Sequence, residues 1–296
     1  MKTPFRVTGR AARTTTVAIA SAAATAALTI PGLALAHGGH GGGGGAVPAP
    51  PTNPTSDSQI QNIDQVKTAI KAYYGDTVTT TPDPVDGATM LHQFNPDGAY
   101  AHQTERIAAK AGHFLAKRAH HWKAHHKHGS SHAQRAVLFD IDDTTLNTYS
   151  YEIYSSFVYN PTSNAAFVNA GSASIFPAVP GMVALEQKAL AKGYTVFFLT
   201  GRPTTQQAGT VANLTNAGYT VDTSDLYLKD ASGATEPWLS SCAPTCTTIQ
   251  YKSLTRQHIE SLGYNIVANF GDQFSDLEGG FADHTVKMPN PMYYLP

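Results

Sequence analysis

A cluster of carboxylates follows a short apolar run near the middle of the sequence. The run Val137–Phe139 has the composition of a buried strand of a parallel sheet, and Asp140, Asp142 and Asp143 come directly after it. Side chains alternate along an extended chain, so Asp140 and Asp142 point to one side. Two carboxylates held close together repel each other unless a cation lies between them, and Mg²⁺ is a hard cation that prefers oxygen ligands. The pattern therefore indicates a metal site or, alternatively, an acidic turn that caps a helix beginning near Thr145.

Further polar groups stand where later strands end or helices begin. In an open α/β sheet, ligands bind outside the carboxyl ends of the strands, so side chains at these positions meet at one edge. A hydroxyl and a lysine there can hold phosphoryl oxygens, and carboxylates can hold a metal ion. Each residue also has a structural alternative, as a turn residue, a solvated lysine or a helix cap. The groups are Thr200 and Arg202 after the run Tyr194–Leu199, Lys252 at the start of a helix, and Asp272 and Asp276 after the run Asn265–Phe270.

The elements that position these groups are predicted to be strands alternating with helices. This alternation is typical of βαβ units and indicates an α/β fold with a doubly wound parallel sheet. An aromatic-rich insertion at about 149–180 predicts a small helical cap over the strand ends. The expected strands are Ala136–Phe139, Tyr194–Leu199, Asp225–Lys229, Asn265–Phe270 and Thr285–Met288, and the expected helices are Pro180–Ala191, one ending near Ala217, and one from Tyr251 or Ser253 to about Leu262.

The first 36 residues have the composition of a secretory signal. Basic residues as far as Arg13 precede the apolar run Val17–Leu35, and Ala34–Ala36 supplies small residues for a signal peptidase. We expect cleavage after Ala36 and secretion, the alternative being an uncleaved membrane anchor. No later stretch is apolar enough to span a membrane. The signal contains four basic residues and no acidic one, and the acidic remainder gives no support to nucleic-acid binding.

The chain of 296 residues, 42 % of them hydrophobic, is long enough to bury a large core. After the signal, we expect a Gly- and Pro-rich linker at 37–56, a helical extension at 57–135 and the α/β core at 136–296. The extension is predicted to hold a helix from Asp57 or Ser58 to about Gly75, whose buried face carries Ile60, Ile63, Val66 and Ile70, a turn-rich loop over Thr77–Ala88, and a long helix from Ala99 to about His128.

The two cysteines of the chain, Cys242 and Cys246, lie four residues apart. In an oxidising compartment, this spacing favours a local disulfide that closes a small loop. Two cysteines without a nearby histidine are too few ligands for a zinc site.

A histidine-rich stretch covers residues 113–132, at the end of the long predicted helix. His121 and His125 are four residues apart and so share one helix face, as a pair of transition-metal ligands would. The alternative is a solvated helix end whose histidines suit the negative end of the helix dipole. The sequence leaves the role of this stretch open.

Four motifs in this order resemble the haloacid dehalogenase (HAD) superfamily of phosphohydrolases. They are D-x-D-x-T (Asp140, Asp142, Thr144), strand-Thr-Gly-Arg (Thr200, Gly201, Arg202), a lone Lys252, and G-D-x-x-x-D (Gly271, Asp272, Asp276). Together with the C-terminal Lys287–Tyr294, they look most like its secreted acid phosphatase branch, subfamily IIIB, which includes the plant vegetative storage proteins. The resemblance covers about 136–296 well and the N-terminal helices loosely.

The resemblance implies a Mg²⁺-dependent enzyme that hydrolyses small phosphate monoesters through an aspartyl-phosphate intermediate. It implies that Asp140 is the nucleophile and Asp142 the general acid and base, with Thr200 and Lys252 as phosphoryl ligands and Arg202 as a substrate contact. The implied Mg²⁺ ligands are the side chains of Asp140 and Asp272 and the backbone carbonyl of Asp142. Asp276 is implied to orient Lys252 or a metal-bound water.

Three alternatives stay open at this point. The chain could be a storage or binding protein on the same scaffold, a phosphotransferase that uses another acceptor, or a metal scavenger acting through the histidine-rich stretch. In the cap, Tyr149, Glu152 and Tyr154 either line a pocket for an aryl or nucleoside leaving group or form the small core of the cap itself.

Overall fold

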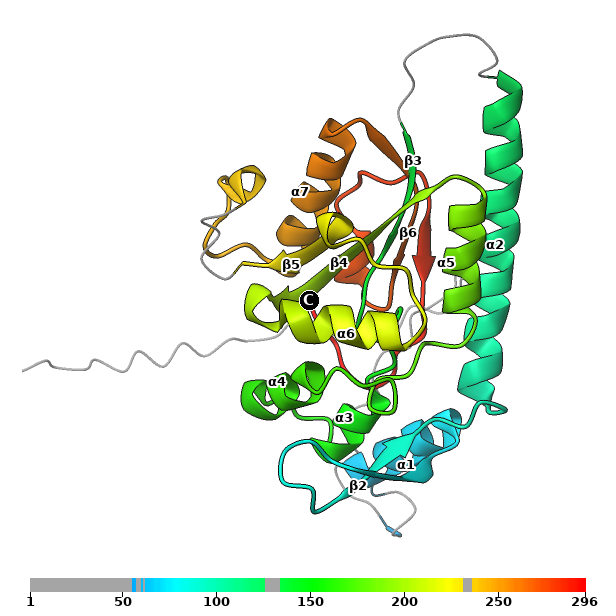
Figure 1. Cartoon of the computed structure of the whole chain (residues 1–296). Helices are drawn as coiled ribbons and strands as arrows, with labels where there is room; N and C mark the ends of the chain where they lie inside the picture. The colour runs from blue at the N-terminus through cyan, green and yellow to red at the C-terminus, as the bar shows by residue number, and fades with distance from the viewer. Residues whose placement is uncertain (1–54, 57–59, 61, 126–133, 231–235) are drawn as a thin grey trace, which may run out of the picture. The chain divides into compact units, whose positions relative to one another are not determined.

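The computed structural model describes residues 55–56, 60, 62–125, 134–230 and 236–296, with the backbone alone for 122–125 (Figure 1). All of them belong to one compact unit, Pro51–Pro296. The predicted signal at 1–36 lies outside the described residues, as do nearly all of the predicted linker at 37–56 and residues 126–132 of the histidine-rich stretch.

A five-stranded parallel sheet forms the centre of this unit, in the order β5-β4-β3-β6-β7. The predicted doubly wound α/β fold is confirmed, because the chain runs outward from β3 to β5 and then crosses back to β6 and β7. The strand bounds are β3 Gln134–Phe139, β4 Thr195–Pro203, β5 Leu226–Lys229, β6 Tyr264–Gly271 and β7 Thr285–Lys287.

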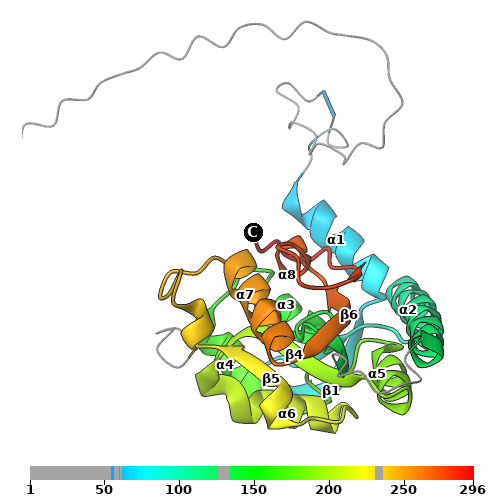
Figure 2. The same ribbon diagram turned by 90° about the horizontal axis from the view of Figure 1, so that it is seen from above.

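Helices cover both faces of the sheet, and the strands are apolar on both sides for that reason (Figure 2). Val137 and Phe139 belong to the core that is shared with α2, α5 and α6. The alternate residues Ala136 and Leu138 pack instead with α7, through Tyr251. The covering helices are α2 Ala99–His125, α5 Met182–Ala191, α6 Gln207–Asn216 and α7 Thr248–Ser261, with the short α8 Phe274–Leu277 and the 3₁₀ helices Thr204–Gln206, Thr223–Asp225 and Pro237–Leu239.

Two short helices, α3 (Tyr149–Tyr154) and α4 (Pro161–Asn169), lie in the segment predicted to be a cap, between β3 and α5. In Figure 1 they sit below the ends of β3 and β4. The side chain of Asn160 caps α4 by accepting hydrogen bonds from the backbone N–H groups of Thr162 and Ser163. Ser156 and Phe157 in the connecting loop have positive φ angles of 57° and 63°, which few residues other than glycine adopt.

The N-terminal extension differs from the prediction in two places. The turn-rich loop predicted over Thr77–Ala88 is a β-hairpin, with β1 at Thr77–Pro82 and β2 at Met90–Gln93. The first helix, α1 (Ile63–Tyr74), begins later than expected because Asn62, not Asp57 or Ser58, is its N-cap. The proposed division at 57–135 and 136–296 stays a prediction.

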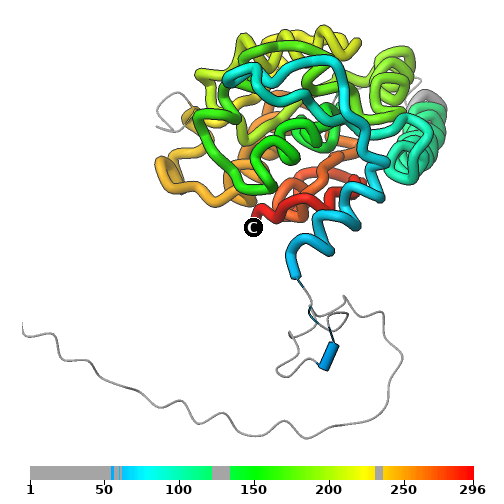
Figure 3. Tube along the Cα trace, turned by 90° about the horizontal axis from the view of Figure 1, so that it is seen from below, coloured from blue at the N-terminus to red at the C-terminus, as the bar shows by residue number. Residues whose placement is uncertain are grey.

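The predicted buried face of α1 is wrong for most of its length. Ile63 and Val66 are 68 % and 57 % exposed, whereas Ile70 is buried. Only the C-terminal half of α1 packs against the rest of the unit, where the Tyr74 ring stacks at 4.4 Å on that of Tyr149. Figure 3 shows the N-terminal half extending away from the body of the unit.

The predicted disulfide between Cys242 and Cys246 is present, in the turn just before α7. Among the described residues, none of the helices has the length and apolar character needed to cross a membrane.

A single carboxylate organises the loop of the β1–β2 hairpin. Asp83 is buried, and its oxygens accept hydrogen bonds from the backbone N–H groups of Val85, Asp86 and Thr89 at 2.9–3.0 Å. Burial alone would raise the pKa of Asp83, but the backbone donors, that of Asp86 foremost, outweigh it and lower the pKa from 3.8 to about 2. The folded state therefore favours the ionised form, and this stabilisation is present above pH 4 and lost as the pH falls through about 2.

We predict that Asp83→Asn lowers the free energy of unfolding at pH 7 by about 1–3 kcal/mol, because the donors lose a charged acceptor. Denaturant unfolding of both proteins at a series of pH values measures the effect. The difference in free energy of unfolding between parent and variant should decrease as the pH falls from 4 toward 2. Asp97→Asn, at an exposed position of the same extension, is the matched control. An equal gap at pH 7 and pH 3 would contradict the role assigned to the carboxylate.

Candidate active site

The carboxyl ends of two central strands bring predicted acidic residues together. Asp140 follows β3 and Asp272 follows β6, and these strands are neighbours in the sheet. With Asp276 they form a buried acid cluster, in which one oxygen of each carboxylate lies within 4.8 Å of the others. In the described part of the chain, no other group of three acidic, histidine or cysteine side chains is close enough to hold a metal ion.

The loop after β6 is shaped so that Asp276 can approach the cluster. Gly271 leaves the necessary space, because a Cβ at this position would overlap the side chain of Asp276. The backbone N–H of Gln273 donates to Asp276 Oδ2 at 2.9 Å. Arg256, fully buried on α7, donates to the backbone carbonyl of Asp276 at 2.6 Å. Sequence reasoning gave Arg256 no role, although its spacing of four residues from Lys252 places both on one helix face.

Lys252 lies inside the acid cluster. Its Nζ donates to Asp140 Oδ1 at 2.5 Å and is 3.1 Å from Asp276 Oδ1. Burial alone would lower the pKa of Lys252, but attraction by Asp140 and then Asp276 outweighs it and raises the pKa above the ordinary lysine value. The lysine is therefore charged. It lies in the second turn of α7 and not at the helix start, because Thr247 forms a capping box with Gln250 and begins the helix earlier than predicted.

The charge balance of the acid cluster fits a divalent cation. Burial and then repulsion from Asp276 raise the pKa of Asp140 despite Lys252, and the same two causes raise that of Asp272 to about 7. Three carboxylates facing one lysine thus leave negative charge uncompensated in a buried place. All the donor atoms are oxygens, which suit a hard ion such as Mg²⁺ better than a softer metal.

The carboxylate of Asp142 does not belong to the acid cluster. Arg202 holds it from Nε at 3.0 and 3.1 Å and from a terminal nitrogen at 2.6 Å. The arginine side chain is only 4 % exposed and that of Asp142 is 31 % exposed, so Asp142 stands at the mouth of the site. Arg202 thus binds the carboxylate of the predicted general acid in the bidentate geometry that arginine favours, and its predicted contact with substrate stays a prediction.

Thr200 is buried on β4, two residues before Arg202. The strand continues through it to Pro203, whereas the sequence predicted an end at Leu199. Its Oγ1 accepts a hydrogen bond from the backbone N–H of Arg202 at 3.1 Å. The carbonyl of Leu199, just before it, accepts from Lys252 Nζ at 2.7 Å. Thr200 and Lys252, the predicted phosphoryl ligands, therefore occupy the same strand end.

Asp143 is a buried acid that sequence reasoning left without a role. It has a positive φ of 56°, and its carboxylate accepts hydrogen bonds from the Thr148 hydroxyl at 2.5 Å and the Tyr293 hydroxyl at 2.9 Å. Burial raises its pKa to about 7 although these donors act against the shift. Its repulsion also contributes to the raised pKa of Asp272. Asp143 is therefore electrostatically part of the site without joining the acid cluster.

The three cap residues singled out in the sequence lie in different surroundings. Tyr149 is buried and donates to Asp76 at 2.9 Å, so it serves the packing of the extension on the cap. Glu152 is buried, and burial and then repulsion from Asp143 and Asp142 raise its pKa to about 8. Tyr154 instead lines a separate pocket.

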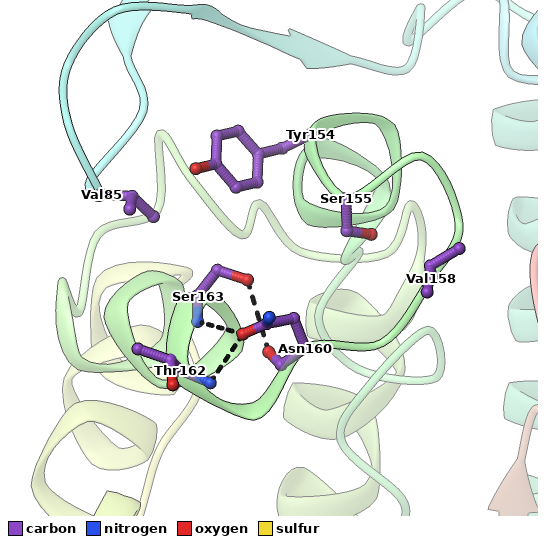
Figure 4. A pocket seen from close by; sticks show the side chains of 7 residues that line it. All are labelled: Val85, Tyr154, Ser155, Val158, Asn160, Thr162 and Ser163. Carbon is purple, nitrogen blue, oxygen red and sulfur yellow. Dashed lines mark hydrogen bonds between the residues drawn. The ribbon is translucent and has the colours of Figure 1, made fainter.

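This pocket, of about 490 Å³, lies between the hairpin loop and the cap helices (Figure 4). None of the residues predicted to be catalytic lines it. The hydroxyls of Ser155 and Ser163 already donate to backbone carbonyls of the cap. Its lining consists of Val85, Tyr154, Ser155, Val158, Asn160, Thr162 and Ser163.

The histidine-rich stretch is only partly described. The rings of His120 and His121 meet edge to face with their centroids 6.1 Å apart, at exposed positions of α2. The described backbone ends at His125 in this region, and His126, His128 and His132 lie beyond it. A metal-binding role for this stretch stays a prediction.

The structure therefore brings together Asp140, Asp272, Asp276, Lys252 and Thr200, and it places Asp142 with Arg202 at the entrance. Their catalytic roles stay predictions. Sequence reasoning gave no role to five further residues of the site. Arg256, Gln273 and Asn290 contact Asp276 or Asp272, and Tyr293 contacts Asp143. The only sequence signal for the last two was the resemblance of the segment Lys287–Tyr294 to the same branch.

Known proteins resemble the chain over this region. A family model described as HAD superfamily, subfamily IIIB (acid phosphatase) matches residues 98–296. The chain is 36 % identical over 169 residues to the stem 28 kDa glycoprotein of Glycine max, covering 55 % of this chain and 61 % of that protein. It is 36 % identical over 162 residues to acid phosphatase 1 of Solanum lycopersicum (53 % and 58 %) and 30 % identical over 162 residues to vegetative storage protein 2 of Arabidopsis thaliana (54 % and 56 %).

The match spans less than two thirds of the length of each of these relatives. Among solved structures, the class C acid phosphatase from Bacillus anthracis aligns with a TM-score of 0.49 and 18 % sequence identity, covering 66 % of this chain and 80 % of that one. The family model covers the whole α/β core and every residue of the acid cluster. This chain therefore belongs to subfamily IIIB, the acid phosphatase subfamily, of the HAD superfamily.

Proposed function

We propose that this protein is a secreted, Mg²⁺-dependent acid phosphatase that hydrolyses small phosphate monoesters through an aspartyl-phosphate intermediate. The position of Asp140 carries the proposal, because its carboxylate contacts a charged lysine inside a buried cluster of oxygen ligands. Family membership supports the same activity, as does the name of the tomato relative, acid phosphatase 1. The signal predicted at residues 1–36 supports secretion.

In the first half of the proposed reaction, a carboxylate oxygen of Asp140 attacks the phosphorus of the ester. The bond between phosphorus and the leaving oxygen breaks, and Asp142 gives its proton to that oxygen as the alcohol departs. Lys252 and the hydroxyl of Thr200 hold the phosphoryl oxygens and stabilise the charge that develops on them. Both groups lie at the strand end beside Asp140, as this step requires.

In the second half, Asp142 takes a proton from a water molecule, whose oxygen attacks the phosphorus of the aspartyl-phosphate. The bond between phosphorus and Asp140 breaks, which releases inorganic phosphate and regenerates both carboxyl groups. Asp142 is the exposed member of the pair with Arg202, so water and leaving group can reach it. Arg202 fixes the direction of Asp142 and so acts on the reaction through that residue.

Carboxylate oxygens of Asp140, Asp272 and Asp276 would hold the cation, and the resemblance implies the backbone carbonyl of Asp142 as a further ligand. When bound, Mg²⁺ supplies positive charge between an anionic nucleophile and an anionic substrate, which otherwise repel each other.

Two rival functions use the same scaffold. Vegetative storage protein 2 is among the relatives, so a protein that holds ligands without turnover is one rival, and the presence of Asp140 favours catalysis over it. A phosphotransferase is the other, and it differs only in the acceptor that attacks the aspartyl-phosphate. Release of inorganic phosphate from p-nitrophenyl phosphate, measured with and without an added alcohol, separates the three functions.

We predict that Asp140→Asn lowers the rate of phosphate release at least about 1,000-fold, because the amide is a poor nucleophile. The change removes one of the repelling charges, so the thermal unfolding midpoint without metal should not fall. Asp97→Asn makes the same change at an exposed position and should keep parental activity. Turnover of Asp140→Asn near the parental rate would exclude Asp140 as the nucleophile.

We also predict that Mg²⁺ stabilises the protein in the absence of substrate. A ligand that binds only the folded state adds about 2.7 kcal/mol at a concentration 100 times its dissociation constant, and the unfolding midpoint rises accordingly. Dialysis against EDTA should abolish both this rise and the activity, and Mg²⁺ should restore both.

Asp272→Asn tests the location of the cation. It should weaken the stabilisation by Mg²⁺ strongly while leaving the unfolding midpoint without metal unchanged or higher. The matched control is again Asp97→Asn. If Mg²⁺ raised the unfolding midpoint of Asp272→Asn as much as that of the parent, the cation would bind elsewhere.

A further inference from the structure

The C-terminal strap, which we define as Lys287–Leu295, runs from β7 across the edge of the sheet that carries the acid cluster. Its backbone begins beside the cluster, since the N–H of Met288 donates to the carbonyl of Gly271 at 2.8 Å. Figure 3 shows this segment, in red, lying beside α1. Two of its side chains reach acids of the site: Asn290 contacts Asp272, and Tyr293 contacts Asp143.

We propose that the strap positions the acids of the site for cation binding, with Asn290 and Tyr293 as positioning residues. This inference rests on the proposed function, because it concerns the site assigned there to the cation. It assigns a role to residues that lie 18 and 150 positions away from the acids they contact.

Asn290 determines which oxygen of Asp272 is left for the cation. Oδ2 of Asp272 accepts two short hydrogen bonds, from Asn290 Nδ2 at 2.7 Å and from Gln273 Nε2 at 2.6 Å. Oδ1 is approached only by the Thr144 hydroxyl, at 3.4 Å, among the contacts of the described residues. The two amide donors therefore occupy one oxygen and turn the other toward the cluster, which is how groups behind a metal ligand orient it.

The orientation of the Asn290 amide is itself fixed. Its Oδ1 accepts a hydrogen bond from the backbone N–H of Met292 at 2.8 Å. If the amide turned over, an oxygen would face the carboxylate of Asp272 and a donor would face the N–H of Met292, so both contacts would become repulsive. The strap thus presents a donor to Asp272 in one orientation only.

Tyr293 engages the second buried acid. Its hydroxyl and that of Thr148 both donate to Asp143 Oδ2, and the backbone N–H of Thr148 donates to Oδ1 at 3.1 Å. Each oxygen of Asp143 therefore has a protein donor. Because its carboxylate is occupied in this way, Asp143 is held apart from the cation ligands although it is buried close to Asp272.

The strap is anchored at both ends, as a positioning element must be. Lys287 Nζ donates to the backbone carbonyls of Asp272 and Met288. At the other end, the backbone of Leu295 donates to Gln273 Oε1 at 3.1 Å and accepts from the Ser275 hydroxyl at 2.9 Å. The same Gln273 donates to Asp272, so the strap and the cation ligand share one hydrogen-bond network.

Isothermal titration of the full chain with MgCl₂, without substrate, tests the proposal. Asn290→Ala should raise the dissociation constant of Mg²⁺ about 10–100-fold, the usual effect of removing a group that orients a metal ligand. Asn290→Asp keeps the shape but sets a like charge against Asp272, so it should weaken binding at least as much. Tyr293→Phe keeps the ring and removes only the donor, and it should weaken binding several-fold.

Tyr294→Ala is the matched control. Tyr294 lies in the same strap and is 75 % exposed, so its replacement should leave Mg²⁺ affinity at the parental value. A second readout separates positioning from a general loss of structure: excess Mg²⁺ should restore kcat in Asn290→Ala and in Tyr293→Phe, with the KM for p-nitrophenyl phosphate close to parental. A variant damaged in its fold would not recover.

Two results would overturn the inference. If Asn290→Ala and Tyr293→Phe both bound Mg²⁺ with the affinity of the parent, the strap would not position the ligands. The proposed function would be unaffected by this result. A parent protein that binds no Mg²⁺ would overturn the cation dependence of the proposed function, and this inference with it.

Discussion

Repulsion between buried carboxylates is the interaction that the rest of this structure has to oppose. Asp140, Asp272 and Asp276 lie together without enough positive charge between them, since Lys252 is the only cationic side chain that pairs with their carboxylates among the described residues. Such an arrangement persists only when rigid elements hold each group in place, and here the ends of two hydrogen-bonded parallel strands do so. Under the proposed function, relief of this repulsion would favour binding of the cation.

The parts of the fold that could be predicted are those encoded by short stretches of neighbouring residues. Strands buried on both faces are short continuous apolar runs, and the runs ending at Phe139, Leu199 and Phe270 were found for that reason. The amphipathic pattern of α1 was misleading, because periodicity shows which face of a helix is apolar but not whether anything covers it. The hairpin after α1 was missed because its prolines and glycine indicated a turn-rich loop, although the residues of β1 (Thr77–Pro82) are mostly β-branched.

The site was predictable in its residue types and less so in its contacts. Polar groups at strand ends converge by topology, so the order of the motifs was enough to bring Asp140 and Asp272 together. Side-chain pairs such as Arg202 with Asp142, or Asn290 with Asp272, depend on the paths of loops, which no sequence period encodes. The disulfide between Cys242 and Cys246 could be predicted, because residues only four apart in the sequence stay close together whatever path the loop takes.

The place of the strap in the chain has a consequence for the order of assembly. During synthesis, Asn290 and Tyr293 emerge after every other residue of the site, and they contact acids from the first and last halves of the core. A partly made chain can pair β3 with β4 but lacks the groups that orient Asp272. Under the proposed function, the cation site would therefore be completed last, when the strap docks beside the ends of β3 and β6.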